Sequence, residues 1–181
     1  MRQAIHVGWH GLWAAAAATL LASCGGKLPT LEEAKETVAE TVKSAPTIID
    51  NGKCELTVSA AISTSSCYVK TMTFSAGRPA IVQFTSYKDP NSESFPSIMV
   101  RAELPAGATS LASGQTLSGQ VFIQEKADGP VWHSQSDSPV VVSVTLADGK
   151  IVDATISADG ITNSETSAAT PISGSLHAIV Q

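Results

Sequence analysis

The chain lacks most of the features that would point directly to a biochemical activity. Its 11 Lys and Arg residues are outnumbered by 16 Asp and Glu. A net charge of −5 excludes a general binder of the nucleic-acid backbone, which needs a basic face. No Gly-rich phosphate loop and no CxxC pair is present, so nucleotide and redox cofactors are not expected. Outside the N-terminus no apolar run approaches the roughly 20 residues of a membrane-spanning helix, which excludes a multi-span membrane protein.

What remains is a composition typical of one folded domain. The chain has 181 residues, of which 43% are hydrophobic and 15% are charged. This hydrophobic fraction is close to the globular average, and 13 Gly and 9 Pro are too few for a fibrous repeat. The sequence therefore predicts a single domain of modest size.

The first 23 residues have the character of a secretion signal. Arg2 precedes an apolar run over residues 12–22, and small residues stand just before Cys24. The run is about half the roughly 20 residues that a helix needs to cross a bilayer, so a retained transmembrane segment is the weaker interpretation. We expect residues 1–23 to be removed during export.

The end of this signal, Leu21-Ala22-Ser23-Cys24, resembles the lipobox of bacterial lipoproteins. The resemblance covers these four positions and the signal. It implies that Cys24 becomes the first mature residue and carries lipid, and two or more acyl chains are enough for lasting membrane attachment. Because Gly25 rather than Asp follows the cysteine, the resemblance also implies the outer membrane, facing the periplasm or the cell surface. The alternative is an ordinary secretory signal in which Cys24 is incidental.

The two remaining cysteines, Cys54 and Cys67, form an even pair in a compartment that oxidises thiols, so we expect a disulfide. No His lies between them, so a metal site there is poorly supported. A hairpin turning at residues 63–66 would leave Cys54 far along the opposite strand, whereas a disulfide brings the two Cα atoms to about 4.4–6.8 Å. The chain is therefore expected to reverse nearer Ala60 and Ala61, or to bring the two segments together by another route.

Residues 24–53 are predicted to form a lipidated N-terminus, an acidic helix and a linker. Thr30 and Glu33 make a capping-box pattern ahead of a short helix over about residues 31–43. Its narrow apolar stripe consists of Leu31, Ala34, Val38 and Val42. Because the helix is acidic, it is not suited to an anionic membrane surface, and we expect it to act as a spacer or stalk.

Residues 54–181 are predicted to form the β domain, because their hydrophobic pattern has a period of two. The clearest run places Val140, Val142, Val144 and Leu146 on one face. We expect an all-β fold, either an antiparallel β-sandwich or a partly closed barrel of about 8–9 strands, preceded by the short N-terminal helix.

Turns and loops separate these runs. Ala-Asp-Gly begins at Ala127, Ala147 and Ala158, and Asp-Gly favours the tight turns of hairpins. Each copy offers a single Asp, so calcium binding is not expected. Residues 88–96 and 105–119 do not alternate and are predicted to be loops.

Few residues of the mature chain could carry chemistry, and no catalytic, metal or cofactor site is predicted. His133 lies close in sequence to Ser134 and Asp137, but a stretch this short does not usually adopt the geometry of a catalytic triad. A possible binding surface consists of Trp132, His133 and Phe95. Trp132 is the single Trp after the signal and is more often a core residue in a small β domain. Phe95 stands in a polar loop, where an aromatic side chain can contact a partner but more often packs onto its own domain.

We therefore expect a membrane-anchored envelope lipoprotein with a non-enzymatic β domain. The domain would have a structural role or bind an envelope protein or a small molecule. Two alternatives remain open. One is an inhibitor or scavenger of a basic secreted protein, which the acidic balance favours. The other is a small hydrolase that uses His133 and would need a cleft around it with a Ser or Asp from a distant strand.

Overall fold

A computed structural model describes residues 50–75 and 77–181, and this part of the chain is all-β. It has ten strands and one 3-10 turn, η1 (Pro90–Ser92). The strands are β1 (Lys53–Thr57), β2 (Ala61–Ser63), β3 (Tyr68–Met72), β4 (Ile81–Thr85), β5 (Ser97–Glu103), β6 (Thr116–Gln124), β7 (Val131–His133), β8 (Val140–Ala147), β9 (Ile151–Asn163) and β10 (Ala169–Val180). These residues include no helix whose length and hydropathy would suit a membrane span.

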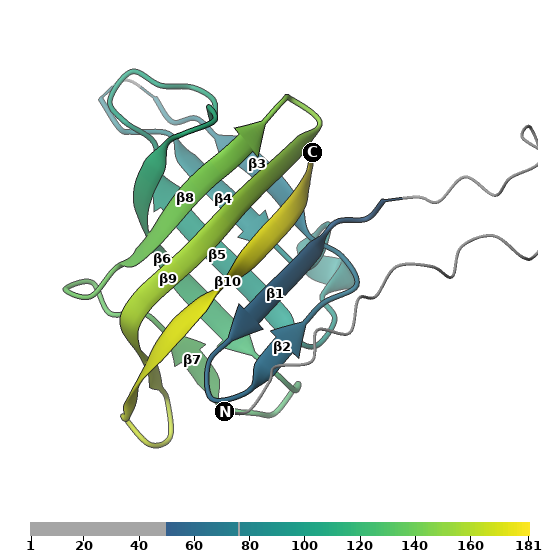
Figure 1. Cartoon of the computed structure of the whole chain (residues 1–181), viewed down its shortest axis with the longest axis vertical. Helices are drawn as coiled ribbons and strands as arrows, with labels where there is room; N and C mark the ends of the chain where they lie inside the picture. Colours follow the sequence, from purple (N-terminus) through teal and green to yellow (C-terminus); the bar gives the residue numbers. More distant parts are fainter. Residues whose placement is uncertain (1–49, 76) are drawn as a thin grey trace, which may run out of the picture. The chain divides into compact units, whose positions relative to one another are not determined.

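Seven of the strands close into a barrel (Figure 1). Their order is β3-β4-β5-β6-β8-β9-β10, and β10 returns to β3. All neighbours are antiparallel except β10 and β3, which are parallel and pair at only two positions. β1 and β2 extend the sheet beside β10, and β7 bridges β6 and β9. The all-β prediction is confirmed. Of the two architectures expected, the structure has the barrel, which is closed rather than partly closed; the helix predicted over residues 31–43 lies outside the described residues.

The barrel interior is filled by the apolar residues that alternate along the strands. One continuous row runs across β3, β4, β5 and β6, where Val69, Phe84, Val100 and Val121 are direct cross-strand partners. All four are 3% exposed or less. Full burial of a side chain of this size contributes roughly 1.5–3 kcal/mol to folding, so such rows are the main source of the barrel's stability.

The two cysteines meet because the first hairpin reverses early. β1 pairs with β2 with Leu56 opposite Ile62, so the turn lies at residues 58–60, as predicted, and not at residues 63–66. Beyond β2 the chain curls back, and the Cys67 N–H donates to the Asn51 carbonyl at 2.9 Å. The Cα atoms of Cys54 and Cys67 lie 5.6 Å apart and both residues are fully buried, which is compatible with the predicted disulfide.

Two of the three Ala-Asp-Gly copies are turns, and the third is not. At the β8–β9 turn, Asp148 accepts the N–H groups of Lys150 and Ile151, both at 2.8 Å, which also lowers the pKa of its carboxyl group. Residues 158–160 instead lie inside the long strand β9, so the turn predicted there is wrong. The cause is β10, which pairs with β9 on both sides of this segment and holds it extended.

Two further expectations are corrected by strand pairing. Leu146 is 41% exposed, because a bulge between Val144 and Leu146 in the pairing with β9 interrupts the alternation. The loop predicted to end at Gly119 ends earlier, because Thr116 to Gly119 pair with β8 and belong to β6. These four residues of β6 line the candidate site.

Candidate functional site

A groove of about 580 Å³ lies on the barrel where β5 and β6 separate. Its walls come from the end of β5, the beginning of β6 and the connection between β7 and β8. Its polar lining includes Arg101, Glu103, Thr116, Ser118, Gln120, Gln135 and Ser136. A volume of several hundred Å³ is in the range of small-molecule and peptide pockets, so this groove is the candidate binding site.

The groove exists because β6 changes its partner. The ladder between β5 and β6 ends at the pair Ala102 and Gly119. From Gly119 back to Thr116, β6 is paired with β8 on its other side. A Cβ atom on Gly119 would lie 2.2 Å from the carbonyl oxygen of Arg101, so only glycine allows this close approach. Beyond this pair, β5 and β6 have no further pairing with each other.

The end of β5 forms one wall of the groove. The Leu104 N–H donates to the Ala80 carbonyl at 2.8 Å, so even-numbered residues of β5 direct their amide groups toward β4. Odd-numbered residues therefore face β6, as Arg101 does in its pair with Gln120. The last pair, Ala102 with Gly119, is therefore one without mutual hydrogen bonds, and the bond that flanks it runs from the Glu103 N–H to the Ser118 carbonyl. The groove opens beyond this bond.

The beginning of β6 forms the opposite wall. The Ser134 N–H donates to the Val121 carbonyl at 3.1 Å, so odd-numbered residues of β6 face away from β5. Thr116 and Ser118 therefore direct their N–H and C=O groups toward the groove. The Ser118 carbonyl is the acceptor for the Glu103 N–H, so the groove begins beyond Ser118.

Two opposite charges stand at the groove. Arg101 and Glu103 are two residues apart on β5, which places both side chains on the outer face of the barrel. The ion pairs among the described residues involve Lys53, Glu55 and the His177 cluster, and neither groove charge takes part in them. Both charges are therefore available to a ligand.

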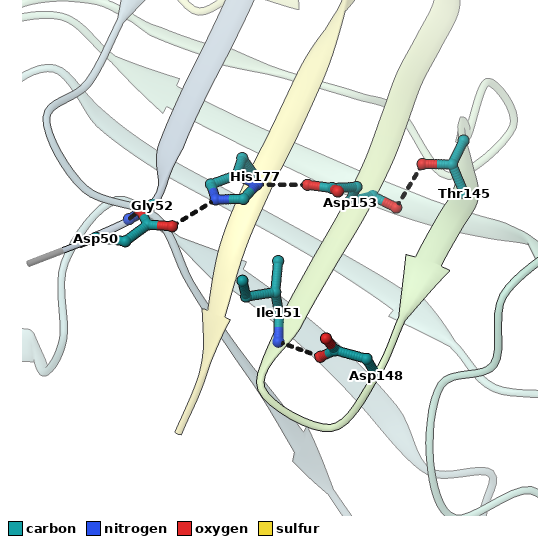
Figure 2. Close-up of polar contacts among 7 residues, drawn as sticks. All are labelled: Asp50, Gly52, Thr145, Asp148, Ile151, Asp153 and His177. Carbon is teal, nitrogen blue, oxygen red and sulfur yellow. Dashed lines mark hydrogen bonds and ion pairs between the residues drawn. The ribbon is translucent and has the colours of Figure 1, made fainter.

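A separate polar cluster lies on the outer face of β10 (Figure 2). The His177 ring places Nδ1 2.5 Å from an oxygen of Asp153 and Nε2 2.8 Å from an oxygen of Asp50. Asp153 is the direct partner of His177 on β9, and Asp50 precedes β1. The hydrogen bonds to Asp50 and then to Asp153 raise the pKa of His177. The pKa of Asp50 is lowered by His177 first and by the Gly52 N–H second.

This His177 cluster is a tie between chain segments rather than a metal centre. The two carboxylates contact different nitrogens of the ring, so the three side chains do not converge on one point. No group of three His, Cys, Asp or Glu side chains is arranged to hold a metal ion in the part of the chain that the structure covers. No local pattern in the sequence indicates this cluster, because the partners of His177 are 24 and 127 residues away along the chain.

The structure does not bring together the three residues of the predicted binding surface. Trp132 and His133 are neighbours on β7, and they point to opposite faces. Trp132 packs against the core, while His133 lies on the outer face opposite Phe122. Phe95 is 40% exposed in the loop before β5. None of these residues lines the groove.

The surroundings of His133 do not support the hydrolase alternative. The neighbouring Ser134 is 4% exposed, and its hydroxyl oxygen accepts the Val121 N–H at 3.0 Å. His133 has Phe122 and Thr162 as its cross-strand partners on the outer face. Neither partner is a carboxylate that could orient the imidazole for catalysis.

No family model, curated protein or solved structure matches this chain. The candidate site therefore depends on its geometry alone. No local pattern indicated this site, because residues 105–119 were predicted to be one loop and the groove depends on which strands pair.

Proposed function

We propose that this chain is a lipid-anchored lipoprotein of the bacterial envelope whose β-barrel domain is a non-enzymatic binding module. The observation that carries the binding role is the groove between β5 and β6, with its polar lining and its two available charges. The signal and the lipobox-like residues 21–24 support the anchor. Gly25 after the lipidated cysteine favours the outer membrane.

The chemistry of the groove favours binding over catalysis. Its lining contains neither His nor Cys. The hydroxyl groups of Thr116, Ser118 and Ser136 make no hydrogen bond to a carboxylate within the described residues, and a serine or threonine nucleophile needs an adjacent base. An inhibitor or scavenger of a basic secreted protein remains the alternative, and it would use acidic surfaces instead of a groove that contains Arg101.

Metabolic labelling tests the anchor. A palmitate analogue should label the wild-type protein and not the Cys24→Ser variant, and the labelled protein should fractionate with the outer membrane. Gly25→Asp should move it toward the inner membrane, by the resemblance to lipoproteins. Equal labelling of wild type and Cys24→Ser would overturn the lipoprotein assignment.

Site-specific crosslinking tests the binding role. A photoreactive side chain at Ser118 should give an adduct in intact cells, while the same group at Ser175, on the outer face of β10, should not. The captured partner, once purified, should bind the wild-type protein and lose affinity for Arg101→Glu. Equal crosslinking at both positions would remove the groove as the binding site.

A further inference from the structure

We propose that the groove and a smaller pocket beside it form one elongated surface that binds an oligosaccharide, with aromatic side chains at one end and planar polar side chains at the other. This inference rests on the proposed function, because it names the ligand class of the same site. It depends on the register of β5 and β6 and on the side chains that line the two hollows.

A second hollow, of about 100 Å³, lies along the same two strands as the groove. Its lining includes the side chains of Tyr87, Met99, Phe122 and Val131, and we call it the aromatic pocket. Met99 and Phe122 are direct partners across β5 and β6. The next outward-facing pair along the same strands is Arg101 with Gln120, and both of these residues line the groove. The two hollows therefore lie end to end and cover the length of β5, which is roughly 20 Å.

The aromatic pocket offers ring surface on the outside of the barrel. Phe122 faces outward on β6, because its neighbours Val121 and Ile123 are fully buried in the interior. Tyr87 follows β4 and is half-buried, and burial, followed by the charge of Glu93, raises the pKa of its hydroxyl group. The hydroxyl is therefore neutral and can both donate and accept a hydrogen bond. A sugar ring has an apolar face of C–H groups, which packs against aromatic side chains of this kind.

The groove supplies the polar groups that the hydroxyl groups of a sugar need. The side chains of Arg101, Glu103 and Gln120 are exposed there and make no hydrogen bond to another described residue. A guanidinium donates, a carboxylate accepts and an amide does both, so together they match hydroxyl groups, which also do both. The hydroxyl groups of Ser118 and Ser136 add two further donors and acceptors to the same lining.

The pairing of the strands favours an oligosaccharide over an extended peptide. β5 and β6 are paired with each other from Ser97 to Ala102, and the bond from the Glu103 N–H to the Ser118 carbonyl closes the end of this ladder. A peptide that adds as a strand needs unpaired backbone groups. A sugar is recognised by side chains alone, and side chains are what this paired sheet presents to both hollows.

Two linear probes test this ligand class directly. They are cellotetraose and chitotetraose, which differ only in carrying a hydroxyl or an acetamido group at the second carbon of each ring. Each is added to the mature chain from Cys24 in a detergent without a sugar headgroup. We expect saturable binding of at least one probe, together with a shift of the Met99 methyl resonance by NMR. No saturable binding of either probe, or binding that leaves this resonance unmoved, overturns the proposal.

Two pairs of variants test whether the probe lies on both hollows. Phe122→Ala removes the ring from the aromatic pocket, and its control is His133→Ala, which changes the partner of Phe122 on β7. Arg101→Ala removes the guanidinium from the groove, and its control is Lys70→Ala on β3. Neither control residue lines either hollow. We expect Phe122→Ala and Arg101→Ala each to weaken probe binding about tenfold and both controls to bind like wild type.

Thermal unfolding checks that each variant is folded. If Phe122→Ala is not, Phe122→Leu takes its place, because leucine fills much of the same volume without a ring. Equal weakening in a variant and its control contradicts the placement of the sugar on this surface. If neither probe binds while Ser118 still crosslinks to a partner in cells, the oligosaccharide class is wrong and the proposed binding function stands.

Discussion

His177 lies directly opposite Asp153 in the register of β9 and β10, and the same imidazole ring also contacts Asp50, which precedes β1. One side chain thus ties the segment that enters the barrel to two strands near the C-terminus. Lys53 is the partner of His177 on β1 and forms an ion pair with Glu55. These are the charged groups that face His177 from β1 and β9.

The His177 cluster makes stability depend on pH. The pKa of His177 is raised from 6.5, chiefly by Asp50, so its contribution is fully present below pH 6.5 and is lost as pH rises through the raised value. The pKa of Asp50 is lowered from 3.8, so its contribution is lost as pH falls through that lowered value. We expect thermal midpoints to decline as pH rises from 6.5 through the raised pKa of His177, and this group causes no further decline above it. Measurements from pH 5 to 9 on wild type and His177→Gln test this.

Three variants distinguish the contributions of Asp50 and Asp153 to the pKa of His177. His177→Gln should flatten the decline at high pH, and Asp50→Asn should flatten part of it, because Asp153 still faces the ring in that variant. NMR titration of His177 should show its pKa falling in both Asp50→Asn and Asp153→Asn. A wild-type slope that persists unchanged in His177→Gln would show that other groups cause it.

Gly52 and Gly149 provide a matched pair for testing close approach. Both have positive φ, at 73° and 86°, which disfavours any residue with a side chain. A Cβ on Gly52 would lie 2.3 Å from the Cys67 carbonyl oxygen and 2.5 Å from that of His177, whereas nothing lies within 4 Å at Gly149. We expect Gly149→Ala to cost about 1 kcal/mol and Gly52→Ala about 3 kcal/mol in chemical denaturation. Equal costs would contradict the close contact.

The predicted disulfide should contribute measurably to stability. Cys54 and Cys67 are separated by 13 positions, and closing a loop of about this length contributes roughly 3 kcal/mol in the chain-entropy model. Cys54→Ser together with Cys67→Ser should therefore lower the thermal midpoint by roughly 10 °C. Mass spectrometry of the non-reduced protein should show the loss of two hydrogens. Two thiols that react readily with an alkylating agent without reductant would contradict the bond.

The interior of the barrel could be predicted from the sequence, because burial follows the alternation that the chain itself carries. Val140, Val142 and Val144 were expected on one buried face, and all three are 2% exposed or less. The alternation fails at Leu146, where a bulge depends on the neighbouring strand. Strand interiors are local properties of the sequence, whereas bulges are properties of a strand pair.

Closure of the barrel and the candidate site could not be predicted for the same reason. β10 and β3 meet through Ile179 with Tyr68 and Val180 with Val69, pairs more than a hundred residues apart that no local pattern marks. The groove depends on β6 changing its partner at Gly119. Only the cysteine pair gave a long-range constraint, and it predicted the position of the first hairpin turn.

The last prediction concerns where the barrel domain begins. Truncation through Ser44 removes the predicted helix but keeps Asp50 and Asn51, whose contacts with His177 and Cys67 are in the structure. We expect the thermal midpoint to stay unchanged, because the core is built from the strands. Truncation through Asn51 removes the hydrogen bond from Cys67, worth about 1 kcal/mol or roughly 4 °C, and also the Asp50 contact with His177, so the midpoint should fall by more than roughly 4 °C. If the shorter truncation already lowers the midpoint or abolishes the near-UV circular dichroism signal, the segment before Ser44 belongs to the folded core and does not act as a tether.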